Sequence, residues 1–332
     1  MPEKPEVQLF ADALHKHLLN KILFDIHIDE KSRYNTKRPT NYYEFITALP
    51  SNVTKVWSKG KKVIICLENG TALVSSLGEE GKWLPEPRNH SGLVLKCGDG
   101  TVAYFDDTRH HGMIEIVMTP EALNERLSRI GLDLLNDNVS AAQWIEKMRL
   151  PILRNKEICY ALMTQEYVSG IGNYIKAMTL YRARVCPAAL LRDLSDEHLT
   201  DLHKHAVDII RQSYRDNGAS LKSYSDFYGN LGKFKIEVYS LEKDPKAPCG
   251  NPVVKNKFSD NGRTTHWCRE HQVLPAPWIG PQEINMDKLR ASKGRGKDTY
   301  KVTELQEFCR REKIGCEGKK EEVVDRLLKK LG

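Results

Sequence analysis

In the first 118 residues, hydrophobic positions recur at helical spacing near the N-terminus and in short strand-like runs after that. The apolar residues Val7, Phe10, Ala11, Leu14 and Leu18 recur at helical spacing, after a proline that suits a first helical turn. Short apolar runs then lie at 23–28, 53–57, 63–67, 71–74, 93–97, 102–105 and 113–118. Tight-turn pairs such as Asn69-Gly70 separate some of these runs. Many short strands with tight turns predict a β-sandwich or a barrel.

The period changes at Thr119-Pro120, and the rest of the chain is mainly helical. Helices are predicted at 120–130, 139–148, 151–164, 173–183 and 195–216. Strand-like runs return at 235–239, 251–254 and 263–268, before a polar, basic and glycine-containing stretch at 286–300 that is typical of a linker. Two helical patterns, 302–311 and 319–331, complete the chain. The pattern therefore predicts an α+β protein of several domains.

Composition narrows the classes of partner. The 332 residues suffice for two or three domains, and 51 Lys+Arg against 44 Asp+Glu give a net charge of +7. This mild excess suits a polyanionic partner. No run is apolar enough to cross a bilayer or to act as a signal peptide, so no membrane partner is expected. The eight scattered cysteines indicate reduced thiols in an intracellular protein. The basic C-terminal segment suits an address in the nucleus or another DNA-containing compartment.

The first residues offer a nucleophile. If Met1 is removed, as is usual before proline, Pro2 becomes a secondary amine that titrates near neutrality and can form a Schiff base with a carbonyl-like carbon. The carboxyl group of Glu3 beside it can supply or accept the protons that such chemistry moves. The alternative interpretation is a Pro-Glu pair that only begins a helix.

A second stretch, Gly170-Ile171-Gly172-Asn173, precedes a predicted helix. Glycines leave backbone N–H groups accessible, and a helix N-terminus attracts phosphate. The Asn173 side chain adds a donor. The alternative is a turn between two packed helices.

Together, Pro2-Glu3, Pro5-Glu6, the β-rich first part and Gly170–Asn173 resemble the formamidopyrimidine-DNA glycosylase/endonuclease VIII family. The resemblance runs through about residue 275. Family members excise oxidised bases and cleave the DNA strand at the abasic sugar. The resemblance implies a catalytic two-sheet β-sandwich at 1–118, a helical domain with a helix–two-turn–helix motif at 119–233, and a finger-like β-hairpin at 234–285.

The resemblance also assigns roles near the N-terminus. Pro2 matches the nucleophile that attacks C1′, Glu3 matches the general acid/base, and Glu6 matches a supporting acidic position. Lys61, in the turn before a sandwich strand, matches a catalytic lysine, and a cation there suits the phosphate beside the lesion. Lys59 and Lys62 are the neighbouring alternatives in case the register slips by one, and Lys62 is also expected to contact DNA.

Further matches concern DNA contacts. Gly172 and Asn173 match the phosphate-binding turn, and Arg263 matches the finger arginine, whose planar fork suits phosphate. Arg109 and His111 match residues that enter the gap left by the flipped base, where they would contact DNA. Glu79 departs from the pattern because a methionine would fall there, and a carboxylate inside the base stack is costly to desolvate.

The finger departs from the family pattern as well. A closed zinc site needs four ligands, whereas the matching places hold Lys246, Cys249, Cys268 and His271. We therefore expect a zincless finger and no cofactor. The alternative is zinc bound by Cys249, Cys268 and His271 with a fourth ligand from elsewhere. The candidates for that ligand are Asp244, His266 and Glu270.

The resemblance predicts a monomeric bifunctional glycosylase/lyase that acts on damaged DNA, duplex or single-stranded, by β,δ-elimination. A zincless finger favours oxidised pyrimidines and hydantoins. The loop at 218–234 is comparable with one that closes over 8-oxoguanine, so a preference for 8-oxoguanine and formamidopyrimidine is the alternative. A catalytically inactive DNA-binding relative and an RNA- or ribosome-binding protein are rival interpretations.

The last residues form a separate module. After the basic linker at 286–300, residues 301–332 carry two apolar stripes around a Gly315–Lys320 link and resemble a SAP motif, a small DNA-binding module. Lysines and arginines before it support binding to DNA without sequence preference. The alternative is a helical hairpin that docks back on the protein or binds a partner.

Overall fold

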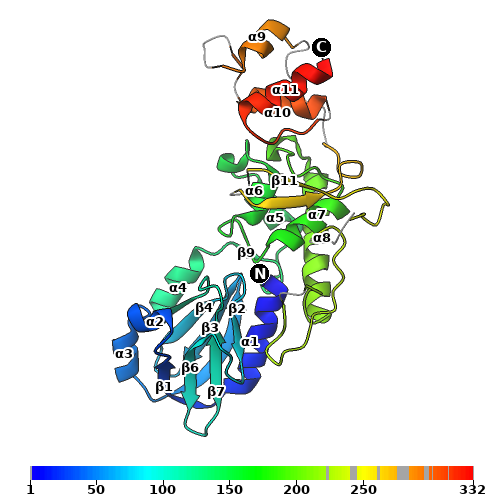
Figure 1. Ribbon diagram of the computed structural model, residues 1–332. Coiled ribbons are helices and arrows are strands. Elements are labelled where there is room, and N and C mark those ends of the chain that lie inside the picture. Colours follow the sequence, from blue (N-terminus) through cyan, green and yellow to red (C-terminus); the bar gives the residue numbers. More distant parts are fainter. Residues whose placement is uncertain are drawn as a thin grey trace. The chain divides into compact units, whose positions relative to one another are not determined.

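The computed structural model describes residues 2–221, 224–239, 245–259, 262–274, 284–294, 299–300, 302–312 and 314–331. The chain forms two compact units whose segments alternate along the sequence (Figure 1). The first unit holds 1–144, 162–176 and 203–236, and the second holds 145–161, 177–202 and 237–332. Both units draw on the predicted helical domain at 119–233, so the predicted domain boundaries remain predictions.

The sheet of the first unit has two halves. Its strands are β1 Ile22–Ile28, β2 Ser51–Lys59, β3 Lys62–Leu67, β4 Ala72–Ser76, β5 Lys82–Leu84, β6 Ser91–Cys97, β7 Val102–Asp106 and β8 Met113–Val117. They follow the order β5-β7-β6-β1-β2-β3-β4-β8. Only Ile22 with Asn52 and Leu23 with Ser51 join β1 to β2. This short pairing separates one half, β5-β7-β6-β1, from the other, β2-β3-β4-β8.

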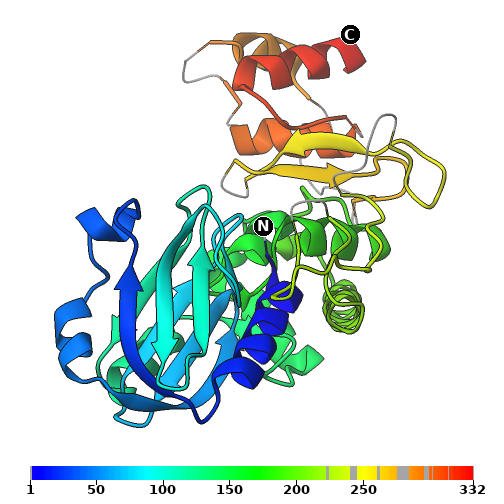
Figure 2. The same cartoon turned by 60° about the horizontal axis from the view of Figure 1, so that its bottom comes forward.

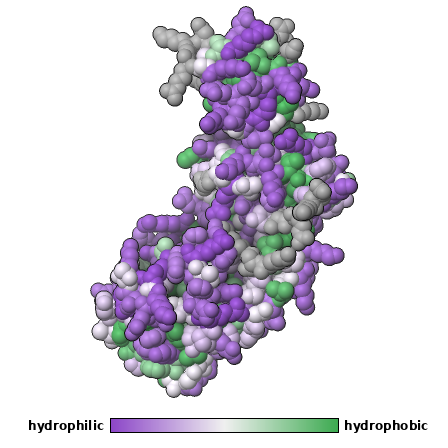
Figure 3. All heavy atoms as spheres, in the orientation of Figure 1, coloured by the Kyte–Doolittle hydropathy of each residue, from purple (hydrophilic) through white to green (hydrophobic). Residues whose placement is uncertain are grey.

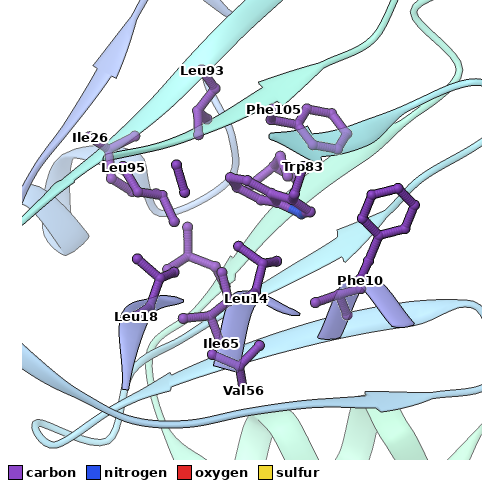
Figure 4. Close-up of a cluster of buried hydrophobic side chains, with 14 of the residues drawn as sticks. Phe10, Leu14, Leu18, Ile26, Val56, Ile65, Trp83, Leu93, Leu95 and Phe105 are labelled. Atoms are coloured by element: carbon purple, nitrogen blue, oxygen red, sulfur yellow. The ribbon is translucent and has the colours of Figure 1, made fainter. Parts of the chain in front are cut away.

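One hydrophobic core serves both halves and the first helix, α1 (Lys4–Leu18). Side chains of α1 meet those of both halves in Figure 4, where Leu14 lies near Trp83 and Ile65. All five apolar positions predicted for α1 are buried. The expected α+β fold with a β-sandwich is therefore confirmed. The short helices α2 (Arg33–Thr36) and α3 (Tyr42–Thr47) and strand β5 were not predicted.

The helices that follow are α4 Pro120–Ser128, α5 Ala141–Met148, α6 Ile158–Met163, α7 Asn173–Arg182 and α8 Asp196–Arg215, with short strands β9 Leu132–Asp133 and β10 Val168–Ser169. The helix expected at 151–164 is shorter because it begins only at Ile158. Just before Ile158, the backbone hydrogen-bonds to a later segment of the chain, since the N–H of Leu191 donates to Lys156 O at 3.0 Å. Every described helix is too short or too polar to cross a bilayer.

The second unit ends in a hairpin and three helices. The hairpin strands are β11 Val254–Lys257 and β12 Thr264–Trp267, drawn as paired yellow arrows in Figure 2. The helices are α9 Met286–Ala291, α10 Val302–Arg311 and α11 Lys320–Leu331. On the face seen in Figure 3, polar side chains predominate and hydrophobic ones form small patches.

Two expectations in this region are wrong. Residues 235–239 form no strand, and Phe234 before them forms only an isolated bridge with Ala219. The stretch 286–300 is not a simple linker, because it contains α9 and buries Leu289 and Tyr300 in a cluster with α10, α11 and Trp267 of the hairpin. The tail therefore docks on the hairpin, which was the alternative interpretation, and its binding to DNA remains a prediction.

Candidate active site

The start of α1 is held inside the first unit. Pro2 is buried, and Glu3 is the N-cap residue of the helix. The N–H of Glu3 donates to Glu6 Oε2 at 2.8 Å, and the N–H of Lys4 donates to Gly170 O at 2.9 Å. These bonds fix the direction in which the chain enters the helix, and therefore the place of Pro2.

The Glu3 carboxylate lies at the N-terminus of α7. Its Oε2 accepts bonds from the N–H of Gly172 at 2.8 Å and of Ile175 at 3.1 Å. Its Oε1 accepts a bond from Tyr174 N–H at 2.9 Å. A helix N-terminus stabilises negative charge, so the carboxylate uses the anion site that the sequence predicted for phosphate. The Gly172 N–H donates to Glu3, and the predicted contact of Gly172 with DNA remains a prediction.

Glycine is required at this turn because the two elements approach so closely. A Cβ on Gly172 would lie 2.3 Å from Cδ of Glu3. Gly170 has φ +87, and a Cβ there would lie 2.5 Å from Cβ of Lys4. The Asn173 side chain accepts a bond from Lys176 Nζ at 3.1 Å, and its predicted contact with DNA remains a prediction.

Burial shifts the protonation of two carboxyl groups. Burial raises the pKa of Glu3 to about 7, the positive charge of Lys61 opposes this rise, and the negative charge of Glu6 adds to it. Burial also raises the pKa of Glu6, which accepts bonds from Tyr174 Oη at 3.0 Å and Ala219 N–H at 2.9 Å. A carboxyl group with a pKa near neutrality can donate or accept a proton at physiological pH.

The three lysines in and beside the β2–β3 turn interact with different groups in the structure. Lys61 acts on Glu3 through its charge. Lys59 pairs with Asp137 instead. Lys62 donates to Ser76 Oγ and lies 4.0 Å from Glu115, on the neighbouring strands. Of the three, the structure brings Lys61 close enough for its charge to act on Glu3, and its catalytic role remains a prediction.

Sequence reasoning missed Lys4. Its side chain and that of Asp133 are fully buried, and their Nζ and Oδ2 atoms lie 2.8 Å apart. The Lys4 ammonium also donates to Ser58 Oγ at 2.6 Å. The partners lie far from Lys4 in sequence, and a lysine in a first helical turn normally indicates a solvated side chain, so no local pattern reveals this ion pair.

The loop residues expected to enter the base stack form an ion-pair cluster. Arg109 Nη1 lies 2.9 Å from Glu79 Oε2, and its Nε lies 3.1 Å from Glu80 Oε1. His111 Nδ1 lies 3.5 Å from Glu79 Oε2. Glu79, which stands where the family pattern has a methionine, thus pairs with both residues that were predicted to contact DNA. Their contact with DNA stays a prediction.

Arg263 belongs to the second unit, where it precedes β12. In the same unit, Cys249 Sγ lies 3.7 Å from Cys268 Sγ. The ring of His271 stacks instead on Tyr181, with ring centroids 4.4 Å apart. No group of three or more metal-binding side chains occurs in the described part of the chain.

The described finger residues do not fit a four-ligand zinc site. The candidates for a fourth ligand leave the zincless finger a prediction. His266 stacks on Tyr239, with ring centroids 4.7 Å apart, and Asp244 lies outside the described residues.

Comparison with known proteins identifies the family. Residues 1–114 match the formamidopyrimidine-DNA glycosylase N-terminal domain, and residues 130–225 match the formamidopyrimidine-DNA glycosylase H2TH domain. The chain belongs to the formamidopyrimidine-DNA glycosylase/endonuclease VIII family. The formamidopyrimidine-DNA glycosylase of Desulfitobacterium hafniense is 28% identical over 281 residues, which are 82% of this chain and 100% of that protein. The enzyme of Ureaplasma parvum is 28% identical over 81% of this chain and 98% of its own.

Solved structures of the family agree in fold. The MutM (Fpg) protein of Thermus thermophilus has a TM-score of 0.71 at 26% identity and covers 82% of this chain and 98% of its own. A Lactococcus lactis Fpg mutant in complex with Fapy-dG-containing DNA has a TM-score of 0.72 at 25% identity, over 82% of this chain and 99% of its own. The family resemblance therefore extends beyond the N-terminal motif to most of the chain.

Proposed function

We propose that this Fpg-like DNA glycosylase of base excision repair is bifunctional, so that it removes a damaged base and then cleaves the strand at the abasic sugar. The observation that carries the proposal is Glu3, a buried carboxyl group next to Pro2 with a pKa of about 7. A protein that only binds DNA has no need for such a group beside a terminal proline. Damaged DNA is the partner.

The proposed reaction begins after removal of Met1 exposes the amine of Pro2. The damaged nucleotide leaves the stack, which costs a few kcal/mol and is easiest at a damaged pair. The Pro2 nitrogen bonds to C1′ while the bond from C1′ to the base breaks, and the base leaves with that electron pair and takes up the proton that the Pro2 nitrogen loses. Glu3 then protonates the ring oxygen O4′ as it leaves C1′, which gives the iminium form of a Schiff base.

Strand cleavage follows from the iminium. It acidifies the proton on C2′, and transfer of that proton to the Glu3 carboxylate, left ionised by the previous step, expels the 3′ phosphate. A second elimination expels the 5′ phosphate. Lys61 and Arg263 are proposed to bind the flanking phosphates, and Asn173 is proposed to hold the backbone.

The proposed lesions are oxidised pyrimidines and hydantoins, and the support is that the finger residues described by the structure do not fit a four-ligand zinc site. Formamidopyrimidine and 8-oxoguanine are the second candidates, because a family relative from Lactococcus lactis was solved with Fapy-dG-containing DNA. The same relative was also solved with DNA that contains an oxidised pyrimidine. A panel of duplex and single-stranded substrates with each lesion separates the two preferences.

The decisive test is borohydride trapping on duplex DNA that contains an abasic site. Borohydride reduces the iminium to a stable amine, so the wild type should form a covalent adduct once mass spectrometry shows that Met1 is absent. Pro2→Gly should weaken trapping, because it replaces the secondary amine. Glu3→Gln should slow trapping by removing the proton donor. A wild type that binds abasic DNA but never crosslinks or nicks it would be a damage-binding relative, and the proposal would be wrong.

A further inference from the structure

Lys4 is a charged side chain in a place where charge is costly. It and Asp133 have no exposed side-chain surface, and their ion pair measures 2.8 Å. Burial lowers the pKa of Lys4, while the charge of Asp133 and its hydrogen bond oppose that change. Apolar residues of similar volume often stabilise a fold as well as a buried ion pair does. Stability alone therefore gives little reason for a lysine here.

The ion pair provides directed bonds between separate segments. Lys4 Nζ donates to Ser58 Oγ at 2.6 Å, at the end of β2. Asp133 Oδ2 accepts a bond from the N–H of Gly60 at 2.8 Å, in the turn between β2 and β3. Through these bonds the first turn of α1, the β2–β3 turn and strand β9 are fixed to one another.

The same residue is tied to the turn that holds Glu3. The Lys4 N–H donates to Gly170 O at 2.9 Å, and a Cβ on Gly170 would lie 2.5 Å from Lys4 Cβ. Two residues beyond Gly170, the N–H of Gly172 donates to the Glu3 carboxylate. Lys4 thus contacts both the segment that carries Lys61 and the segment that binds Glu3.

We propose that Lys4, with Asp133, is a positioning residue for the strand-cleaving site, because it holds the β2–β3 turn against α1 so that Lys61 stays beside Glu3. The inference rests on the proposed function, in which Glu3 transfers protons during the reaction at Pro2. Lys4 itself is buried and paired, and it takes no part in the chemistry.

Burial raises the proton affinity of Glu3, and the charge of Lys61 opposes that rise. The charged or titratable groups that face Glu3 are Lys61 from the β2–β3 turn, Glu6 from α1 and Tyr174 from α7. Of these, Lys61 lowers the pKa of Glu3 and Glu6 raises it. If the turn loosens and Lys61 moves away, the pKa of Glu3 rises further. The midpoint near pH 7 in a pH–rate profile should then move to higher pH.

Two further charged groups, Asp137 and Lys59, act on the Lys4 ammonium. Beyond Asp133, the charge of Asp137 raises the pKa of Lys4 and that of Lys59 lowers it. Lys59 and Asp137 pair with each other, so their influences on Lys4 oppose one another. A variant that removes Lys4 and the charge of Asp133 together leaves this second pair intact.

The test compares the full-length wild type with the double variant Lys4→Met/Asp133→Asn. Asparagine keeps an acceptor for the turn, and neither new side chain is charged. The matched control is Lys96→Met/Asp25→Asn, an ion pair of 3.5 Å that is 37% and 38% exposed. For each protein, the unfolding midpoint, the affinity for abasic duplex and the single-turnover rate of borohydride trapping are measured between pH 5.5 and 8.5.

We expect the double variant to unfold near the wild-type midpoint and to bind abasic duplex with similar affinity. Its trapping rate should fall about 100-fold, the scale of a small misplacement of reacting groups, and its pH midpoint should rise. The control should match the wild type throughout. If the double variant does not fold, Ser58→Ala decides by the same two kinetic readouts, since it removes one bond of Lys4 and leaves the ion pair.

Two results would overturn the inference, and they differ in what else they overturn. A variant with the wild-type rate and pH midpoint shows that Lys4 has no positioning role, while the function of Pro2 and Glu3 stands. A wild type that forms no adduct at any pH removes the proposed function, and the inference is lost with it.

Discussion

The raised pKa of Glu3 predicts a stability that depends on pH in a direction opposite to that of most carboxyl groups. The pKa is about 7 in the folded protein, against an ordinary value of 4.5. Between these values the folded state holds a proton that the unfolded state has lost. Folding is therefore most favoured by this group below pH 4.5, and that contribution is lost as the pH rises to about 7.

The size of the effect follows from the two pKa values. The interval from 4.5 to about 7, at about 1.36 kcal/mol for each pKa unit, amounts to about 3 kcal/mol. A typical domain unfolds with about 5 to 15 kcal/mol, so the charged Glu3 removes a substantial part of the stability at pH 8. Glutamine has a similar shape and no titration in this range, so Glu3→Gln should not show the loss.

The assay is urea unfolding of the wild type and Glu3→Gln at several pH values from 5 to 8. Glutamine places an NH2 group among the backbone donors of Gly172, Tyr174 and Ile175, and this cost is the same at every pH. The informative quantity is the change in the stability difference with pH. It should shift in favour of Glu3→Gln by about 2 to 3 kcal/mol between pH 5 and 8.

A control isolates this effect from the pH dependence of the rest of the protein. Glu125 is 72% exposed and pairs with Arg129 at 2.8 Å, so Glu125→Gln should keep a nearly constant stability difference over the same range. Glu6 titrates in all three proteins, and its contribution largely cancels in the comparison. A constant difference between wild type and Glu3→Gln would mean that Glu3 is already ionised at pH 5, and the reasoning about burial would be refuted.

Three further predictions concern other parts of the chain. Gly172→Ala should slow borohydride trapping about 100-fold, because the new Cβ would lie 2.3 Å from Cδ of Glu3; unchanged kinetics would show that the turn yields without cost. A chain that ends at residue 284 should lose about 1.5 to 3 kcal/mol of stability and show a red-shifted emission of Trp267, which is 8% exposed in the full chain. An unchanged spectrum would contradict packing of the tail on the hairpin. Arg263→Lys should weaken binding to abasic duplex about tenfold in a titration at fixed salt, because lysine keeps the charge but loses the planar fork. Equal affinities would remove the role of Arg263 at the phosphates.

The sequence predicted most strands of the sandwich because their apolar runs are local and end at tight turns. The pair Asn69-Gly70, for example, separates β3 from β4 as expected. The stretch 286–300 was misjudged because its lysines and glycines outnumber its apolar residues. Only tertiary packing shows that Leu289 and Tyr300 are buried. Local composition therefore predicts secondary structure better than it predicts which polar segments pack.

The candidate site shows a similar division between residues and their surroundings. Pro2 and Glu3 could be selected from sequence because a terminal secondary amine beside a carboxyl group has recognisable chemistry. The turn at Gly172 could be selected too, but for a phosphate, whereas its N–H donates to a carboxylate 169 residues away. Lys4 could not be selected at all, because its partner Asp133 lies in a short strand with no motif of its own.

The environment of Glu3 explains why its protonation could not be inferred from the motif. Three backbone donors and a helix N-terminus favour the charged carboxylate and would, in an exposed site, lower its pKa. Burial outweighs them, and the neighbouring charge of Glu6 acts in the same direction as burial. Lys61 opposes both, so the pKa of about 7 is a balance. In that balance, the charge of Lys61 contributes most to stabilising the ionised form of Glu3. The residue types of the site come from the sequence, whereas its proton chemistry comes from the contacts that bring Lys61, Glu6 and α7 together.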